Sequence, residues 1–277
     1  MDKREKISYL KNKAMELRET ALAMIHAAKS GHPGGSLSIA DIMAALYFDE
    51  MRFDPRNPAW EDRDRFVLSK GHVCPILYSA LIMNGFMPKD EIYNLRKFGS
   101  VLQGHPCMKR TPGVDISTGS LGQGISCAVG MAIGLKRLGK NSRVFCMVGD
   151  GETNEGQVWE AIQAAVKYGL DNLITFIDYN RLQVDGFCED IMPLRSLPGK
   201  FRAFGCSVHE INGHSIEEIL DALDKVRNSK DGQPKIIVAS CVKGKGVSFM
   251  ENEIDWHGMA PNDEQFARAL SEIRSAV

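Results

Sequence analysis

The sequence lacks any apolar run of about twenty residues, the length that a helix needs to cross a membrane. Residues 1–6 are mostly charged and lead into an amphipathic helical pattern, so they lack the apolar centre of a secretion signal. The formal net charge is only −1, which gives no electrostatic basis for binding nucleic acid or a membrane surface. We therefore expect partners that are neither nucleic acids nor membranes.

Zinc-type pairs and linker segments are also missing. The seven cysteines include no CxxC pair, and the seven histidines form no HxxxH or HExxH pair. Several cysteines lie in apolar runs, where a free thiol behaves as a small buried hydrophobe, so we expect a reducing, cytoplasmic location. No repeat, low-complexity tract or Pro/Ser-rich linker divides the chain, which indicates one domain over residues 1–277.

What the sequence does contain is an alternation of strand-like and helix-like segments. Short apolar runs end in polar or glycine-rich turns, and amphipathic or small-residue stretches separate them. This alternation predicts a doubly wound, mostly parallel α/β sheet with helices on both faces. We expect strands at 65–69, 143–148, 172–177, 208–211 and 234–240, helices at 6–28, 75–84, 155–168, 215–227 and from 263, a further helix that segment 117–124 opens and that runs to 138, and a loop at 187–197.

One helix boundary depends on a breaker cluster. Residues 30–35, Ser-Gly-His-Pro-Gly-Gly, are expected to end the first helix, because glycine and proline interrupt its hydrogen bonding. Ser38 is then expected to cap a second helix that runs to Leu46, with Asp41 at the capping-box position.

Polar residues follow two consecutive predicted strands in the central βαβ unit, residues 143–186. Gly149, Asp150 and Gly151 follow the first strand, and Asn180 follows the second. The carboxyl ends of parallel strands share one edge of a sheet, where ligands bind, and Mg²⁺ prefers carboxylate and carbonyl oxygens. A Gly-Asp-Gly turn alone is common, but the added asparagine favours a metal site.

Four histidines occupy glycine-flanked turns: His32, His72, His105 and His257. Histidine titrates near neutrality and can donate or accept hydrogen bonds, so several converging on one pocket can move protons and hold hydroxyl groups. Residues 117–124 open a helix with glycines, which favours either anion binding at its N-terminus or close helix packing. The other three histidines have no expected catalytic role: His26 on a helix face, His209 in a strand, and His214 as a candidate helix cap.

Six motifs occur in the order seen in transketolases, and the match covers essentially the whole chain. They are SGHPGG at 30–35, SKGH at 69–72, GHP at 104–106, TGSLGQG at 118–124, GDG at 149–151 with Asn180, and WHG at 256–258. The GDG turn with its following asparagine resembles the metal motif of thiamine-diphosphate (ThDP) enzymes. The chain resembles the N-terminal, diphosphate-binding domain of a transketolase, and specifically the N-terminal subunit of a split one.

The resemblance implies a set of functional residues. ThDP works as an ylid that adds to a ketose carbonyl and stores the resulting carbanion, so that a two-carbon ketol unit passes to an aldose phosphate. His105 is expected to hold the donor's C1 hydroxyl, and His32 and His257 to bind hydroxyls and move protons. The implied sets are His32, His72, His105 and His257 for catalysis; His72, Gly119, Ser120, Leu121, Gly151, Glu155, Asn180 and His257 for the cofactor; and Asp150, Asn180 and the Leu182 carbonyl for Mg²⁺, with Ca²⁺ or Mn²⁺ as alternatives.

Two residues depart from the family pattern, and two others match family carboxylates. Ser120 stands where the family commonly has proline, and Tyr179 where many ThDP enzymes have asparagine or aspartate. Glu155 matches an interface carboxylate of the family, or is simply an acidic residue near a helix N-terminus. Glu160 matches a family carboxylate that is buried, with the same alternative.

The family also has a pyrimidine-binding domain, which supplies the glutamate that activates ThDP, and a C-terminal domain. The resemblance therefore implies that the partner is a C-terminal transketolase subunit in an α₂β₂ assembly that acts on sugar phosphates, and that this chain alone has no activity. Three alternatives remain: a transketolase-like subunit for a specialised sugar, a subunit of another ThDP enzyme (a deoxyxylulose-phosphate synthase or a 2-oxo acid dehydrogenase), and a non-catalytic regulatory homologue.

Overall fold

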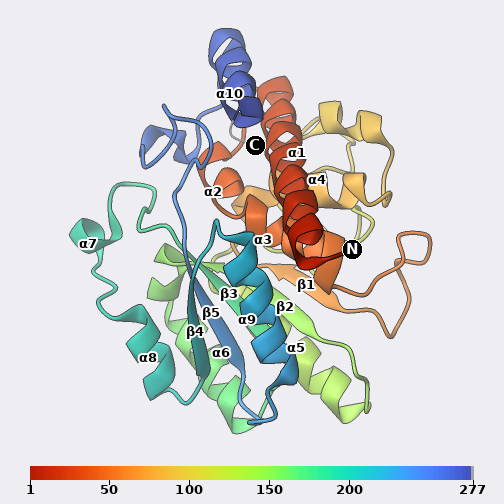
Figure 1. The fold of residues 1–277 in the computed structure, drawn as a ribbon, viewed down its shortest axis with the longest axis vertical. Helices are drawn as coiled ribbons and strands as arrows, with labels where there is room; N and C mark the ends of the chain where they lie inside the picture. The colour runs from red at the N-terminus through yellow and green to blue at the C-terminus, as the bar shows by residue number, and fades with distance from the viewer. Residues whose placement is uncertain (276–277) are drawn as a thin grey trace.

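Five parallel strands form the centre of the molecule, which a computed structural model describes for residues 1–275 (Figure 1). The strands lie in the order β1-β2-β3-β5-β4, and every neighbouring pair is parallel. Their bounds are β1 Arg65–Leu68, β2 Val144–Gly149, β3 Leu173–Tyr179, β4 Ser207–Asn212 and β5 Lys235–Ser240. The predicted parallel α/β sheet is confirmed.

Helices cover both faces of this sheet, because side chains on a strand alternate between the faces. In β2, Phe145 and Met147 join one apolar core, whereas Val144, Cys146 and Val148 join the other. The first core contains α1 (Lys3–Ala28), α3 (Ala40–Ala45), α4 (Cys74–Met83) and α9 (Ile216–Asn228), and the second contains α5 (Gln123–Arg137), α6 (Gly156–Lys167) and α8 (Leu197–Ala203). The remaining helical segments are α2 (Pro33–Ser38), α7 (Cys188–Ile191), α10 (Asp263–Ser275), a π turn at Leu46–Glu50 and 3₁₀ turns at Gly71–Val73, Lys89–Asn94, Gly151–Asn154 and Asp255–His257.

Three local predictions are wrong. Helix α2 begins at Pro33 and includes both glycines of the breaker cluster, so Ser38 is its last residue and caps nothing. The Ser38 hydroxyl instead donates to a carboxylate oxygen of Asp178, 2.7 Å away. Strand β3 continues past Ile177 to Tyr179, because Asp178 pairs with Gly149 and Ala239 on the neighbouring strands. The short helix α7 lies in the segment 187–197 expected to be a loop.

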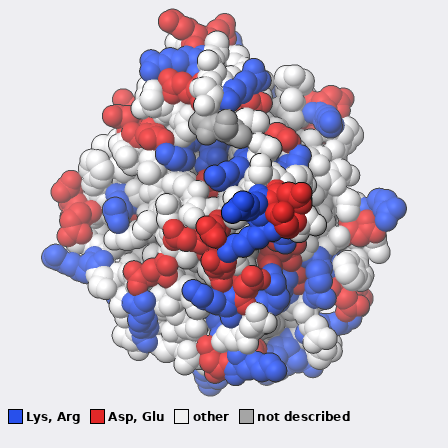
Figure 2. Space-filling model, viewed as in Figure 1, with Lys and Arg blue, Asp and Glu red and all other residues white. Residues whose placement is uncertain are grey.

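The surface agrees with the near-zero net charge. Acidic and basic side chains are intermixed over the face in Figure 2. Within residues 1–275, no helix is both long and apolar enough to span a bilayer.

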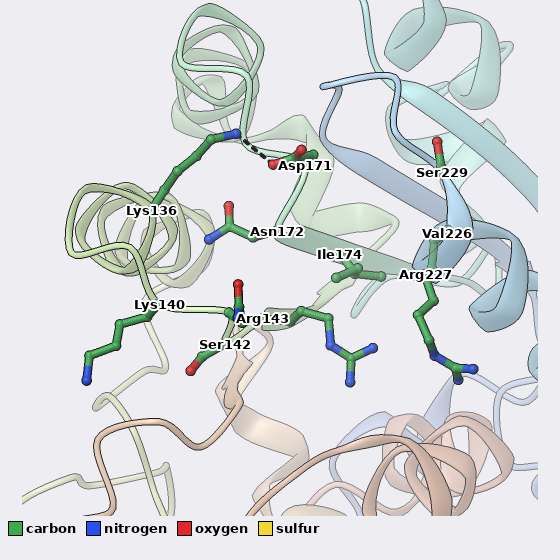
Figure 3. Close-up of a pocket in the computed structure, with 11 residues that line it drawn as sticks. Lys136, Lys140, Ser142, Arg143, Asp171, Asn172, Ile174, Val226, Arg227 and Ser229 are labelled. Atoms are coloured by element: carbon green, nitrogen blue, oxygen red, sulfur yellow. Dashed lines mark hydrogen bonds and ion pairs between the residues drawn. The ribbon is translucent and has the colours of Figure 1, made fainter.

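A cavity of about 360 Å³ lies at the amino edge of the sheet, opposite the strand ends that carry the motifs (Figure 3). Four cations line it, and each has a carboxylate partner. Lys136 pairs with Asp171, Lys140 with Asp62, and Arg143 and Arg227 both with Glu50. Because these charges are already neutralised within the chain, the cavity offers no free positive field to an anionic ligand.

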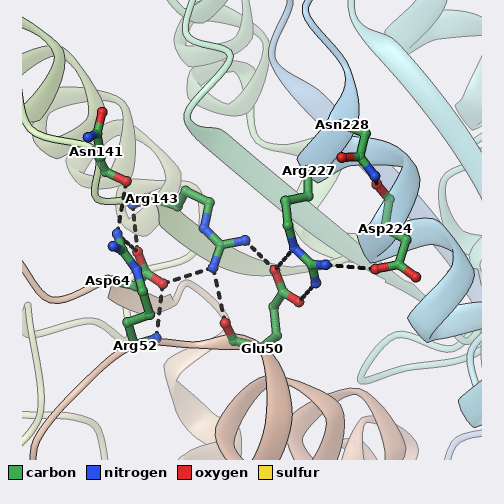
Figure 4. Close-up of polar contacts among 8 residues, drawn as sticks. All are labelled: Glu50, Arg52, Asp64, Asn141, Arg143, Asp224, Arg227 and Asn228. Atoms are coloured by element: carbon green, nitrogen blue, oxygen red, sulfur yellow. Dashed lines mark hydrogen bonds and ion pairs between the residues drawn. The ribbon is translucent and has the colours of Figure 1, made fainter. Parts of the chain in front are cut away.

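The carboxylate of Glu50 is the centre of this ion-pair network (Figure 4). Its side chain is only 1 % exposed, so burial makes its charge dependent on the two arginines. We expect Glu50→Gln to lower the free energy of unfolding by about 2 kcal/mol, since a neutral amide replaces the charge-assisted hydrogen bonds of a buried carboxylate to two arginines. Each arginine keeps a second carboxylate partner, Asp64 for Arg143 and Asp224 for Arg227. Urea unfolding of the purified chain measures this loss.

Asp224→Asn is the matched control for that experiment. Asp224 also pairs with Arg227, but its side chain is 60 % exposed, and such pairs contribute about 0.5 kcal/mol. Equal losses in the two variants would show that the buried network contributes no more than a surface ion pair.

Candidate active site

A cleft of about 280 Å³ opens at the carboxyl edge of the sheet, where β2 and β3 end. It collects residues from segments far apart in the sequence, as expected for the ligand-binding edge of a parallel sheet. Its lining is Gly35, Lys70, His72, Leu121, Gly149, Asp150, Gly151, Glu152, Asn154, Glu155, Asn180, Leu182, Gln183, Val184, Asp185, Lys243 and His257.

Asp150 and Asn180 are held next to each other by the backbone after β3. Arg181 adopts a left-handed conformation (φ 64°), and its amide donates to a carboxylate oxygen of Asp150 at 2.5 Å. The Asn180 side-chain oxygen accepts the amide of Leu182 at 3.0 Å, a local turn typical of asparagine. A left-handed non-glycine residue costs of order 1 kcal/mol, so this turn stores strain to aim polar groups at the cleft.

The Asp150 residue is 2 % exposed, and its carboxyl group accepts hydrogen bonds from the backbone amides of Gly151 and Arg181. Burial and the nearby Asp178 raise the pKa of Asp150 to about 7. A carboxylate in this position gains stability from any cation that approaches it. Leu182 places its carbonyl in the same cleft, 3.4 Å from the ammonium group of Lys243.

Two buried lysines border these oxygens. Lys70 is paired with Asp178 at 2.5 Å, and both side chains are almost fully buried. Lys243 donates to a ring nitrogen of His257 at 2.8 Å and to the Gln183 carbonyl at 3.2 Å. Burial and the charge of Lys70 lower the pKa of Lys243 to about 8, so it remains mostly cationic at neutral pH.

Three of the four predicted histidines meet beside the lysines. The ring centres of His32, His72 and His257 lie 5.1–5.4 Å apart. Burial is the largest cause of their lowered pKa values, about 4 for His32, about 3 for His257 and well below 6.5 for His72. All three are therefore neutral at pH 7. Because Lys243 donates to Nδ1 of His257, the proton of that ring lies on Nε2.

The fourth histidine, His105, is exposed and lies outside this cluster. Its ring packs on Gly119, where an added Cβ would lie 2.8 Å from the ring. Gly119 has a φ of 143°, so only glycine suits both the backbone and the contact. Of the three predicted residues in this turn, Leu121 lines the cleft, whereas Gly119 and the exposed Ser120 do not.

The glycine-rich entry to α5 is packed closely. A Cβ on Gly124 would lie 2.6 Å from the Cα of Ser69 at the end of β1. This contact requires glycine, so the packing role of the segment is observed directly. A buried carboxylate, Glu152, ties the same loops together by accepting from Ser69 Oγ at 2.5 Å and from the amides of Gly122 and Gly149 at 2.9 and 3.0 Å.

The two remaining predicted carboxylates are both exposed. Glu155 lines the cleft and precedes α6, but its side chain caps none of the helix amides. Glu160, which matches a family carboxylate that is buried, lies at a position on α6 that faces away from the apolar core of this chain.

Sequence reasoning missed several cleft residues, above all Lys70, Glu152 and Lys243. Each had a usable signal, because each lies at or just beyond the carboxyl end of a predicted strand or its turn. Lysine is usually a solvated surface residue, and nothing in a single sequence shows that these two are 3 % and 2 % exposed.

The cleft fits a divalent cation and a diphosphate. Asp150, Asn180 and the Leu182 carbonyl offer the hard oxygen donors that Mg²⁺ prefers. Lys70, Lys243 and the neutral histidines offer N–H donors suited to phosphate oxygens. The side-chain nitrogen of Gln183, which lines the cleft, is buried without a hydrogen-bond partner among residues 1–275, so the cleft holds an unused donor.

Comparison with known proteins gives the family. The family model described as "Transketolase, thiamine diphosphate binding domain" matches residues 10–273. The chain belongs to the transketolase family. The expectations of a transketolase relative and of a ThDP-binding domain are thereby confirmed.

Relatives in the transketolase family are of two lengths. The chain is 44 % identical to the 6-deoxy-6-sulfo-D-fructose transketolase subunit SqwG of Clostridium sp. (strain MSTE9), over 95 % of this chain and 96 % of that protein. It is 40 % identical to an apulose-4-phosphate transketolase subunit from Phocaeicola vulgatus, over 94 % and 92 %. It is also 42 % identical to the transketolase of Rattus norvegicus, over 99 % of this chain but 43 % of that protein.

A solved transketolase from Campylobacter jejuni superposes with a TM-score of 0.92 at 34 % identity, over 97 % of this chain. The chain spans 43 % of the length of that transketolase. This agreement confirms the transketolase-type α/β fold around the cleft.

Proposed function

We propose that this chain is the ThDP-binding subunit of a two-chain transketolase, which transfers a two-carbon ketol unit from a ketose phosphate to an aldose phosphate. The observation that supports this most strongly is the meeting, in one cleft, of Asp150, Asn180 and the Leu182 carbonyl with two buried lysines and two histidines. In this proposal residues 1–277 form a single diphosphate domain, and the pyrimidine and C-terminal domains belong to another chain.

Asp150, Asn180 and the carbonyl of Leu182 would hold the metal ion, with Mg²⁺ first and Ca²⁺ or Mn²⁺ as alternatives. The raised pKa of the buried Asp150 supports this role, since an unbalanced buried carboxylate favours a cation. Lys243, whose ammonium group lies 3.4 Å from the Leu182 carbonyl, would balance the charge of the diphosphate beside this metal site.

The diphosphate would lie against His72, His257 and Gly151, with Lys70 and Lys243 balancing its charge. Gly151 lines the cleft, and a Cβ there would lie 3.0 Å from the side chain of Gln183, so the small glycine suits this position. Residues Gly119, Ser120, Leu121 and Glu155 would border the cofactor. Bound ThDP would supply the ylid that adds to the ketose carbonyl and would stabilise the resulting carbanion.

Three neutral histidines suit the handling of sugar hydroxyls. A neutral imidazole donates one hydrogen bond and accepts another, so His32, His72 and His257 can each hold a hydroxyl and pass a proton. One buried nitrogen of His32 has no hydrogen-bond partner in the described chain, so this ring keeps an unused hydrogen-bonding position. His105, packed on Gly119, would hold the donor's C1 hydroxyl.

The partner in this proposal is a C-terminal transketolase subunit, joined in an α₂β₂ assembly in the cytoplasm. Two relatives that match over nearly their whole length are named as transketolase subunits, which supports a two-chain arrangement. The seven cysteines are all free, as a reducing compartment requires.

The test is ketol transfer with ThDP and Mg²⁺, measured on this chain alone and mixed with the C-terminal transketolase half from the same genome. We expect activity only in the mixture. Robust activity of the chain alone would contradict the split arrangement, and silence of the mixture despite ThDP binding would favour a regulatory homologue.

A specialised donor is a second candidate, because the relatives named for 6-deoxy-6-sulfo-D-fructose and apulose 4-phosphate share 44 % and 40 % identity with this chain. The assay should therefore compare xylulose 5-phosphate, 6-deoxy-6-sulfofructose and apulose 4-phosphate as donors, each with the same aldose acceptors. The donor with the largest kcat/KM identifies the physiological class. Turnover of 2-oxo acids in place of all three would indicate another type of ThDP enzyme.

A further inference from the structure

A buried polar cluster lies behind the cleft, outside the residues that line it. It joins Arg18 on α1, Asp41 on α3 and His214 in the turn between β4 and α9. Arg18 donates to the carboxylate of Asp41 at 2.5 Å, and a ring nitrogen of His214 lies 3.0 Å from the same carboxylate. Burial disfavours the charge of Asp41, but Arg18 and His214 outweigh it and lower its pKa to about 2.

The contact of the second ring nitrogen of His214 determines which nitrogen of the ring carries the proton. Its Nε2 lies 2.8 Å from the backbone amide of Val242, and a backbone amide can only donate. Nε2 must therefore accept, and the ring proton lies on Nδ1, where it is donated to the ionised Asp41. The carboxylate thus selects the tautomer that can hold Val242.

Val242 is the residue immediately before Lys243. Strand β5 ends at Ser240, so the ladder no longer holds the amide of Val242, and His214 supplies its acceptor. From here the chain turns so that the ammonium group of Lys243 reaches the Leu182 and Gln183 carbonyls and the ring of His257. Two backbone bonds of 2.9 Å, from the Asn252 amide to the Lys243 carbonyl and from the Gly244 amide to the Gly34 carbonyl, hold the chain after Val242. His214 supplies the side-chain acceptor that holds the residue before Lys243.

We propose that His214 is a positioning residue for the cleft, which holds the Val242 amide and thereby aims Lys243 at the diphosphate. Asp41 and Arg18 support it by keeping the ring in the accepting tautomer. The role of Lys243 at the diphosphate rests on the proposed function, whereas the contact between His214 and Val242 does not.

Two variants of His214 each keep one of its two hydrogen bonds and lose the other. The amide of glutamine reaches about as far as Nε2, so His214→Gln keeps an acceptor for Val242 and loses the bond to Asp41. The amide of asparagine ends near Nδ1, so His214→Asn keeps a donor for Asp41 and leaves Val242 without an acceptor. A cavity of about 250 Å³ borders Asp41 and His214, so both side chains fit without overpacking.

The first measurement is amide hydrogen exchange of Val242 by NMR on the chain without cofactor. We expect exchange in His214→Asn to be about tenfold faster than in the wild type, since one hydrogen bond is lost, and exchange in His214→Gln to be within about threefold. Equal exchange in the two variants would overturn the proposal, whatever the reaction of the complex.

The second measurement is ketol transfer by the complex with the C-terminal half at varied ThDP. We expect the KM for ThDP to rise about tenfold in His214→Asn with kcat within about threefold, because cofactor binding is lost rather than chemistry. His214→Gln should restore the wild-type KM. An unchanged KM in His214→Asn would overturn the positioning role.

Two outcomes separate this proposal from the proposed function. An inactive wild-type complex would contradict the function, and Val242 exchange would then decide the role of His214 by itself. If His214→Asn does not fold, His214→Gln decides. A wild-type KM for ThDP in His214→Gln would support the proposal. A rise of about tenfold in that variant, the equivalent of one lost hydrogen bond, would overturn it.

Discussion

Replacement of Asp150 by alanine is expected to abolish ketol transfer by the two-chain complex. In the proposed function Asp150 is the only carboxylate among the three metal ligands, so its loss removes the main charge that holds the cation. Without the cation the diphosphate loses its anchor. We expect kcat/KM to fall on the order of a thousandfold, which corresponds to about 4 kcal/mol of lost transition-state stabilisation.

A thermal shift separates binding from turnover in this experiment. Saturating ThDP and Mg²⁺ should raise the Tm of the wild-type complex and leave that of Asp150→Ala unchanged, since a ligand stabilises only the state that binds it. Asp190→Ala is the matched control, because Asp190 is an exposed aspartate on α7 outside the cleft. An Asp150→Ala complex that keeps both the shift and the activity would show that the metal lies elsewhere.

The second large effect is expected on stability, at the buried pair of Lys70 and Asp178. The exposed fractions of their side chains are 4 % and 0 %, so neither charge has solvent to replace its partner. Lys70→Met should lower the free energy of unfolding by about 3–5 kcal/mol, because Asp178 is left as an uncompensated buried charge. Urea unfolding of the chain alone measures this without cofactor or partner.

Two further variants test whether the stranded charge of Asp178 causes that loss of stability. Adding Asp178→Asn to Lys70→Met should recover much of the stability, since the stranded charge is then gone. Lys245→Met is the matched control, because Lys245 pairs with Glu251 while its side chain is 37 % exposed, and it should cost about 1 kcal/mol or less. A Lys70→Met loss no larger than this control would mean that Asp178 is neutral in the folded chain.

The fold was predictable because its signals are local. Four of the five strands, all but β4, are short and mostly apolar runs that end in a polar or glycine-rich turn, and this pattern can be recognised in the sequence alone. The errors arose where tertiary contacts outweigh local preference. Gly34 and Gly35 lie in a helix because they are buried against Lys243 and Val73, where a Cβ would meet atoms at 3.1 Å or closer. A breaker cluster in isolation gives no sign of that contact.

Some residues of the cleft were predictable from sequence motifs, whereas the placement of others is known only from the structure. Asp150, Asn180, His72 and His257 were predicted from motifs, and the structure brings all four to one cleft. His105 was assigned to the same pocket by resemblance, but its exposed ring packs on Gly119 outside the three-histidine cluster. Lys70 and Lys243 follow the ends of predicted strands, but only the folded chain shows that their side chains are buried.

The order of residues was enough to indicate the parallel α/β fold, the transketolase family and the edge of the sheet where ligands bind, because periodicity and ordered motifs are properties of neighbouring residues. Only the folded chain shows which charges are buried, which histidine tautomer is present and which backbone amide lacks a strand partner. Those properties depend on residues far apart in the chain, such as Asp41, His214 and Val242, and they come into being only when folding excludes water from between them.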